Sequence, residues 1–113
     1  MLARPLRVRQ TNEWQRLHRH GQAVHLRDLS LKFAPNQLPH PRFGFMVGNT
    51  VSKQATVRNR TKRQLRAICR QLTPRVRPGY DCIIMTRRGA VTLTYPQLQT
   101  QVVHLLTRAR LYR

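Results

Sequence analysis

Hydrophobic residues recur with a helical period over residues 57–72. At 3.6 residues per turn, five positions share one narrow stripe: Val57, Thr61, Leu65, Ile68 and Leu72. The rest of the surface is polar and mostly cationic, and it holds Arg58, Asn59, Lys62, Arg63, Arg66 and Arg70, with Arg60 near its far edge. No acidic residue interrupts this segment, so no ion pair within the helix offsets the repulsion. The pattern therefore predicts an amphipathic helix with a thin apolar seam and a broad basic face.

The pattern elsewhere predicts a mixture of strands and helices. In chain order we expect a helix over 11–20, strands over 23–34 and 42–47, the basic helix, a strand over 80–86 and a helix over 95–109. The last helix has a capping box, because Gln97 follows Thr94 by three residues. This order predicts an α+β fold, a single α/β sandwich domain.

Strand pairing follows from the same pattern. The parity of apolar residues changes near Arg27 and Asp28, which indicates a bulge or bend in the strand over 23–34. A proline-rich turn over 35–41 predicts that this strand and the next form an antiparallel hairpin. The apolar run over 82–85 is typical of an interior strand. The basic helix would complete a β-α-β unit, which base rates make right-handed.

Composition adds a strong positive charge to this picture. The chain has 113 residues, with 22 Lys and Arg against 3 Asp and Glu, and a formal net charge of +19. Because this charge repels itself, the expected partner is a nucleic acid or an anionic membrane. No apolar run approaches the ~20 residues of a membrane span, so we expect none. We predict a basic arm over 1–10, able to contact phosphate, and one domain over 11–113.

The reactive residues do not form a site that points to catalysis. The acids are scattered at Glu13, Asp28 and Asp81, and no phosphate-cradling glycine loop is present. We therefore expect no catalytic residue and no metal site on the protein. Cys69 and Cys82 lie in apolar surroundings, so we expect buried free thiols and a reducing cytoplasm.

Two local alternatives remain open. Trp14 suits a core anchor and a stacking platform for a base about equally. A stand-alone RNase could use His20 and His104 as an acid–base pair, although the sequence favours an anion-binding protein over a nuclease.

Two charged motifs resemble a known family. Arg42 and Gly44 begin an R-F-G-F-x-V strand, which is followed by R-N-R-T-K-R-Q-L-R over 58–66. These motifs, together with the E-W-Q segment near the N-terminus and L-Y near the C-terminus, are similar to the protein subunit of bacterial ribonuclease P. The resemblance covers nearly the whole chain.

The resemblance implies a fold and a set of roles. The β-α-β crossover would be left-handed, against the base rate. The basic helix would bind the large catalytic RNA, through Arg58, Asn59, Arg60, Lys62, Arg63, Arg66 and Arg70. A cleft between sheet, first helix and basic helix would bind the single-stranded 5′ leader of precursor tRNA, through Trp14, His18 and Lys53.

The resemblance also implies the chemistry. The RNA, with Mg²⁺ bound mainly to it, would cut the phosphodiester in the bacterial cytoplasm, and no obligate protein partner is expected. Two departures concern the leader: His18 stands where the family usually has a second aromatic residue, and Asn49-Thr50 stand where it usually has Lys-Lys. The alternative is a small ribosomal or general RNA-binding structural protein with a similar basic composition.

Overall fold

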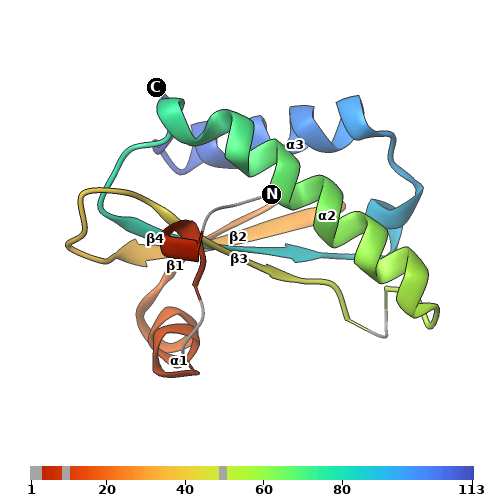
Figure 1. Cartoon of the computed structure of the whole chain (residues 1–113), viewed down its shortest axis with the longest axis horizontal. Coiled ribbons are helices and arrows are strands. Elements are labelled where there is room, and N and C mark those ends of the chain that lie inside the picture. The colour runs from red at the N-terminus through yellow and green to blue at the C-terminus, as the bar shows by residue number, and fades with distance from the viewer. Residues whose placement is uncertain (1–3, 9–10, 49–50) are drawn as a thin grey trace.

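A twisted sheet divides the helices into two groups, one on each face (Figure 1). The computed structural model describes residues 4–8, 11–48 and 51–113. Asn49 and Thr50, which stand where the family usually has Lys-Lys, lie outside the described residues. The main elements are α1 (Thr11–His20), β1 (Gln22–His25), β2 (Leu29–Pro35), β3 (Arg42–Met46), α2 (Ala55–Leu72), β4 (Tyr80–Thr86) and α3 (Tyr95–Arg108). Short 3₁₀ segments occur at Arg4–Leu6, Thr73–Arg75 and Arg88–Thr92.

The helices form where the pattern predicts them. The seam of α2 buries Thr61, Leu65, Ile68, Cys69 and Leu72, whereas Val57, at its start, is only half-buried. At the start of α3 the Thr94 hydroxyl accepts from the Gln97 backbone, and the Gln97 side chain accepts from the Thr94 backbone. The predicted capping box is therefore confirmed.

The predicted strand over 23–34 is wrong, because it is two strands. Residues 26–28 turn the chain, and β1 pairs with β2 in antiparallel register, with Val24 opposite Leu31. The change of parity thus marks a hairpin turn and not a bulge. Reversing the chain brings Val24 and Leu26 to the same apolar cluster as Leu29 and Leu31.

The predicted antiparallel hairpin between the strand over 23–34 and the strand over 42–47 is also wrong, because β2 and β3 are not neighbours. In the described part of the chain the sheet has four strands in the order β1-β2-β4-β3. Strand β4 lies between β2, its antiparallel neighbour, and β3, its parallel neighbour. The prediction that its apolar run forms an interior strand is confirmed, since Cys82, Ile83 and Ile84 are buried.

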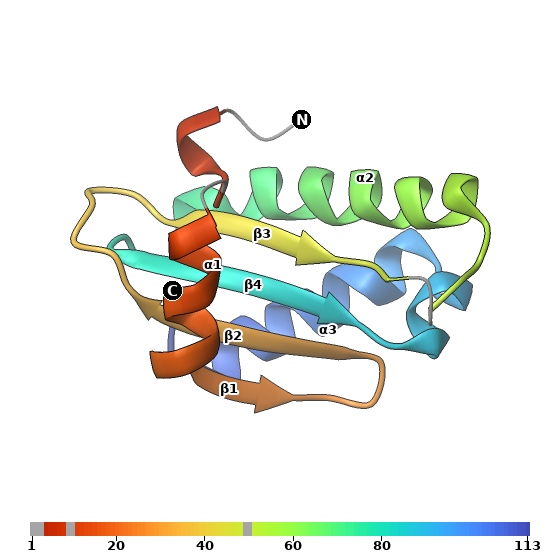
Figure 2. The ribbon, with the colours of Figure 1, turned by 90° about the horizontal axis from the view of Figure 1, so that it is seen from below.

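The connection from β3 through α2 to β4 is left-handed. In Figure 2 both strands run to the right, α2 lies behind the sheet, and the chain moves from β3 down to β4. The right-handed expectation from base rates is therefore wrong, and the expectation from the family resemblance is confirmed.

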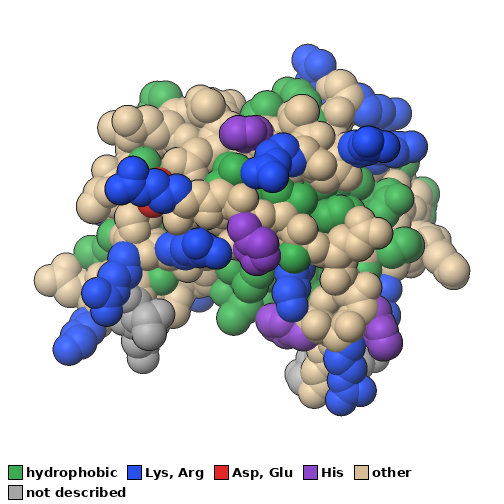
Figure 3. All heavy atoms as spheres, turned by 180° about the vertical axis from the view of Figure 1, so that it is seen from behind, with side chains coloured by type: hydrophobic (Ala, Val, Ile, Leu, Met, Phe, Trp, Pro, Cys, Tyr) green, Lys and Arg blue, Asp and Glu red, His purple; other side chains and the backbone are tan. Residues whose placement is uncertain are grey.

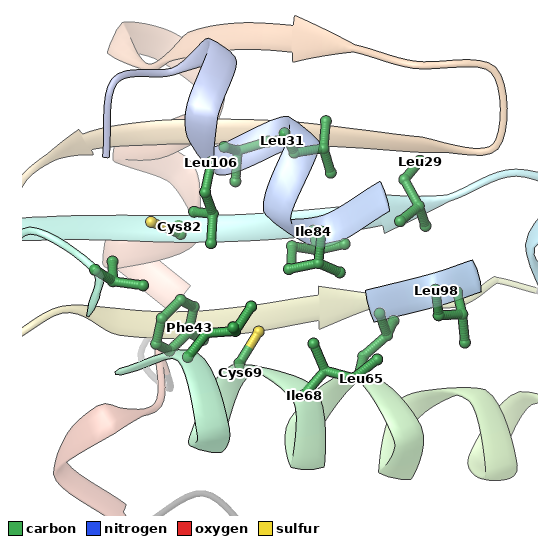
Figure 4. Packing of buried hydrophobic residues seen from close by; sticks show 14 of the residues in the cluster. Leu29, Leu31, Phe43, Leu65, Ile68, Cys69, Cys82, Ile84, Leu98 and Leu106 are labelled. Carbon is green, nitrogen blue, oxygen red and sulfur yellow. The ribbon is translucent and has the colours of Figure 1, made fainter. Parts of the chain in front are cut away.

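Side chains point alternately to the two faces along each strand, so a separate apolar cluster forms on each face of the sheet. The larger cluster lies between the sheet and α2 and α3, and includes Phe43, Leu65, Ile84 and Leu106 (Figure 4). The smaller cluster lies under α1 and consists of Val8, Leu17, Ala34 and Ile83, with Trp14 and Met85 packed against it.

Both cysteines belong to the larger cluster as free thiols, as predicted. Burial raises the pKa of Cys69 and of Cys82 far above the ordinary value for a thiol, so both remain protonated. They therefore act as small apolar side chains in this core.

Part of the predicted basic arm lies along the outer edge of the sheet. Arg7 forms an isolated parallel bridge with Phe43, and the Val8 backbone donates a 2.8 Å hydrogen bond to the Phe43 carbonyl. The segment thereby covers part of the exposed edge of β3 and carries Arg7 beside α1.

A buried carboxylate joins α1 to the sheet. Asp81 is fully buried, and its Oδ1 and Oδ2 accept 2.7 Å hydrogen bonds from Nε and NH2 of Arg42. Arg16 of α1 donates to Oδ2 at 2.9 Å, and Asn36 donates to Oδ1 at 2.8 Å. Arg42 also pairs with Glu13 of α1. We call these five residues the Asp81 cluster.

The hydrogen bonds and ion pairs of the Asp81 cluster compensate the cost of burying the Asp81 carboxylate. The hydrogen bonds that Arg42 donates to the Asp81 carboxylate raise the pKa of Arg42 above its ordinary value, although partial burial opposes this. Because the bonds come from α1, the β2–β3 loop and β3, the cluster fixes the position of α1 over the sheet.

Replacing Asp81 by Asn should lower the free energy of unfolding by about 3–5 kcal/mol, because it leaves a partly buried guanidinium poorly compensated. Urea denaturation measures this loss. Asp28→Asn is the matched control: Asp28 is only half-buried, and its Oδ2 accepts a 3.2 Å hydrogen bond from the Gln101 amide. The Asp28→Asn substitution should lower the free energy of unfolding by about 1 kcal/mol. Equal losses in the two variants would show that the cluster does not have this role.

Candidate nucleic-acid interface

The apolar stripe of α2 packs against the core, so the basic face of the helix points outward. Asn59, Arg60, Arg63 and Arg70 are exposed, and Arg58, Lys62 and Arg66 are partly exposed. Arg58 also donates a 2.8 Å hydrogen bond to the Ser52 carbonyl, which ties the preceding loop to the helix. No side chain caps the N-terminus of α2, and no acid lies in its first turn, so the positive end of the helix dipole adds to the same potential.

The acidic residues are bound to partners away from this face. Glu13 and Asp81 belong to the Asp81 cluster, and Asp28 accepts from Gln101 on α3. Lys and Arg side chains also spread over the opposite side of the molecule, where little acidic surface is visible (Figure 3). The surface thus offers phosphate contacts without internal neutralisation, as expected of a protein that binds a polyanion.

Trp14 lies against the sheet at a position that only glycine allows. An ideal Cβ on Gly44 would stand 2.8 Å from both Cη2 and Cζ2 of Trp14, closer than side-chain contacts permit. The indole is half-buried against the cluster of Val8, Leu17, Ala34 and Ile83. Trp14 is therefore a packing residue that keeps part of its surface accessible. The core-anchor alternative is confirmed, and the stacking role stays a prediction.

The accessible part of Trp14 borders a hollow of about 270 Å³, lined also by Arg7 and Arg66. The Arg7 Nε is buried without a hydrogen-bond partner among the described residues. The hollow brings an aromatic ring and two guanidinium groups together from α1, the N-terminal segment and α2. Stacking beside fixed cations suits an unpaired nucleotide.

His18 lies farther along α1, one turn beyond Trp14, and is exposed. The Lys32 ammonium lies 3.5 Å from the His18 Nδ1 and donates to the His18 carbonyl at 3.3 Å. Beyond α1 the sheet face is open (Figure 2), and Met46, 42% exposed, lies there opposite Met85 in register. This surface offers apolar contact and cations together.

Lys53 is not part of this group. It is exposed in the loop between β3 and α2, which lies at the opposite end of the sheet from α1 (Figure 2). Lys53 is instead close in sequence to the first turn of the basic helix.

The structure does not support the alternative histidine pair or a metal centre. His20 ends α1 and His104 is exposed on α3, and these helices cover opposite faces of the sheet. Among the described residues, no group of three or more His, Cys, Asp or Glu could hold a metal ion. Within the same residues, no helix has the length and apolarity needed to cross a membrane.

Comparison with known proteins agrees with this geometry. The family described as Ribonuclease P matches residues 2–110. The chain belongs to the ribonuclease P protein family.

Relatives match the chain over almost its whole length. A ribonuclease P protein component from a Cyanothece species is 35% identical, covering 98% of this chain and 97% of the relative. One from Roseiflexus castenholzii is 37% identical over 96% of this chain and 88% of its own. The solved RNase P protein of Staphylococcus aureus aligns with a TM-score of 0.87 at 25% identity, over 96% of this chain and 98% of that chain.

The ribonuclease P motifs fall on two neighbouring elements. The R-N-R-T-K-R-Q-L-R run lies on α2, and the R-F-G-F run lies on β3, with Arg42 in the Asp81 cluster and Gly44 under Trp14. Arg42 and Gly44 of the strand motif therefore both contact residues of α1 and help to position that helix on the sheet.

Sequence reasoning missed Arg16 and Lys32 on this surface, and it assigned Arg7 to a basic arm without placing it beside Trp14. Lys32 could have been found, because it alternates with buried Leu31 and Phe33 and must point to the opposite face. Arg7 and Arg16 left no comparable signal, since their positions depend on long-range contacts with Phe43 and Asp81.

Replacing Gly44 by Ala should displace the indole of Trp14. The chain has one tryptophan, so its fluorescence maximum reports this movement directly. Stability should fall by about 1–3 kcal/mol, the usual effect of overpacking.

Gly89→Ala is the control for overpacking far from Trp14. Its Cβ would lie 2.1 Å from the Asp28 Oδ1, so it should also destabilise. It should leave the native fluorescence spectrum unchanged. A Gly44→Ala protein with the wild-type spectrum would refute the contact.

Proposed function

We propose that the chain is the protein subunit of ribonuclease P and acts as an RNA-binding partner of its catalytic RNA. The observation that carries this proposal is the exposed α2 face, where the family motif lies free of any acidic residue. The names of the relatives imply partnership with ribonuclease P RNA.

The α2 face is the proposed contact with the catalytic RNA. Arg58, Arg60, Arg63, Arg66 and Arg70 supply planar guanidinium groups that suit bidentate phosphate binding, and Asn59 and Lys62 add further donors. Each neutralised phosphate releases counterions, so affinity should fall steeply as salt rises.

The surface around α1 is the proposed contact with the 5′ leader of precursor tRNA. Trp14 offers a stacking surface beside Arg7 and Arg66, and His18 with Lys32 extends the cationic surface along α1. Stacking and phosphate contacts carry little base preference, which suits a protein that serves many tRNA precursors. Lys53 would act at the other end of the sheet, next to the basic helix.

The cleavage chemistry is assigned to the RNA. Among the described residues, no group of three or more His, Cys, Asp or Glu could hold a metal ion, whereas exposed Arg and Lys side chains are many. We propose that Mg²⁺ bound mainly by the RNA would supply the metal chemistry, and that the protein would lower the electrostatic repulsion between the catalytic RNA and the precursor tRNA. A bacterial cytoplasm is the expected location.

Reconstitution tests this function. The purified chain, added to its cognate catalytic RNA at low Mg²⁺, should raise the rate of 5′ cleavage of precursor tRNA above that of RNA alone. The double variant Arg60→Ala/Arg63→Ala should bind the RNA more weakly, with a log–log salt slope smaller by about 0.7–0.9 per lost contact.

Arg27→Ala, compared with Arg60→Ala alone, is the control for the loss of one positive charge, because Arg27 is exposed in the turn between β1 and β2. Cleavage that stays at the RNA-alone rate would reject the function. Cleavage activity in the chain without RNA would point to a stand-alone nuclease, and equal binding of precursor and mature tRNA would point to a general RNA-binding protein.

Trp14→Ala should mainly reduce the preference for substrate with a leader. Loss of one stacked base corresponds to about 1–3 kcal/mol. The measurement compares holoenzyme Kd for precursor tRNA with and without its leader. Trp14→Phe keeps an aromatic face and should retain most of the preference. Equal weakening for both substrates would contradict the role given to Trp14.

A further inference from the structure

A second hollow, of about 280 Å³, lies at the end of the sheet where β2 ends and β4 begins. Phe33 and Tyr80 line it, with ring centroids 6.3 Å apart and an interplanar angle of 59°. The exposed side chains of Arg77, Arg110 and His20 border it. The functional surfaces described above do not include this hollow.

The lining has the chemistry of a single-nucleotide site. Tyr80 is half-buried, so its ring is held in place by the core and remains accessible. No acidic residue lines the hollow, and two guanidinium groups stand at its border. The volume is near the lower end of the ~300–1,000 Å³ typical of ligand pockets, which suits one base.

The backbone of Arg110 provides an independent observation. Helix α3 ends in a Schellman motif, in which the Leu111 backbone donates to the Leu106 carbonyl at 2.9 Å and the Arg110 backbone to that of Thr107 at 3.0 Å. Arg110 has φ +62°, in the left-handed region that glycine occupies without steric cost. The fold alone therefore favours glycine here.

Arg110, at this strained position, is one of the residues that line the hollow. Arg77 NH1 donates to the Arg110 carbonyl at 3.3 Å, so the two arginines are held together at the border. A residue that lowers stability and yet supplies an arginine to a hollow that is also lined by Tyr80 is expected where a ligand contact matters.

We propose that this hollow binds one unpaired nucleotide of the catalytic RNA, with its base on Tyr80 and its phosphate between Arg77 and Arg110. Helix α1 crosses the sheet between this end and the open face assigned to the leader (Figure 2). A leader on the open face would have to pass around α1 to reach Tyr80, so the catalytic RNA is the favoured source. The inference rests on the proposed role as an RNA-binding subunit.

Arg110→Gly separates binding from folding. It removes the guanidinium and relieves the left-handed strain, so the Tm should stay unchanged or rise. Affinity for the catalytic RNA should fall, with a salt slope smaller by about 0.7–0.9. Arg27→Gly removes the same charge at an exposed turn and should weaken affinity less.

Tyr80→Leu tests the stacking surface. It should weaken binding of the catalytic RNA by about tenfold, whereas Tyr80→Phe, which keeps the ring, should bind like the wild type. Urea denaturation of both variants identifies any loss that comes from unfolding. Ultraviolet cross-linking of the wild-type complex should join Tyr80 to a nucleotide of the catalytic RNA.

Holoenzyme assays distinguish the source of the nucleotide. Saturating Arg110→Gly protein should still stimulate cleavage and keep the wild-type preference for leader-bearing substrate, which shows that the proposed function stands. A loss confined to leader-bearing substrate would mean that the hollow takes the leader and would overturn the assignment. Arg110→Gly and Tyr80→Leu affinities equal to those of Arg27→Gly and Tyr80→Phe would overturn the site itself.

Discussion

The buried carboxylate of Asp81 is the constraint on which the arrangement of the proposed RNA-binding surfaces depends. It lies at the start of the central strand and takes hydrogen bonds from α1, from the β2–β3 loop and from β3. A buried charge is tolerated only when its partners are close and its oxygens are satisfied. This requirement fixes the helix that carries Trp14 relative to the strand that carries Gly44.

The central position of β4 connects the two faces of the protein. Asp81 and Ile83 face α1, whereas Cys82 and Ile84 face α2 and α3, because side chains alternate along a strand. The surface around α1 and the helix with the ribonuclease P motif are thus packed against opposite sides of one strand. This geometry fixes the distance and orientation between the proposed leader contacts and the proposed catalytic-RNA contacts. It does so without a direct contact between α1 and the apolar stripe of α2.

The charge distribution explains how a chain with a formal net charge of +19 can fold. Two of its three acidic residues neutralise arginines where α1 meets the sheet, and the third accepts from Gln101 between the β1–β2 turn and α3. The remaining cations lie at the surface, where water screens them until a polyanion binds. The acidic residues are therefore used in contacts within the fold. RNA binding should relieve the repulsion among the surface Arg and Lys side chains that remains after folding.

Sequence by itself determined the local elements and the nature of the partner. The seam and basic face of α2, the capping box of α3 and the interior strand β4 follow from periodicity and short-range capping, which depend on neighbours only a few residues away. The excess of Arg and Lys likewise indicated a polyanion before any fold was known. The left-handed crossover was expected from the family resemblance and not from any local pattern. Tertiary structure alone decided that residues 26–28 turn the chain and that β4 enters between β2 and β3. It also decided that Arg16 reaches Asp81 and that Arg7 lies beside Trp14. These contacts join residues far apart in the chain, and because each depends on the packing of several elements at once, no local pattern specifies them.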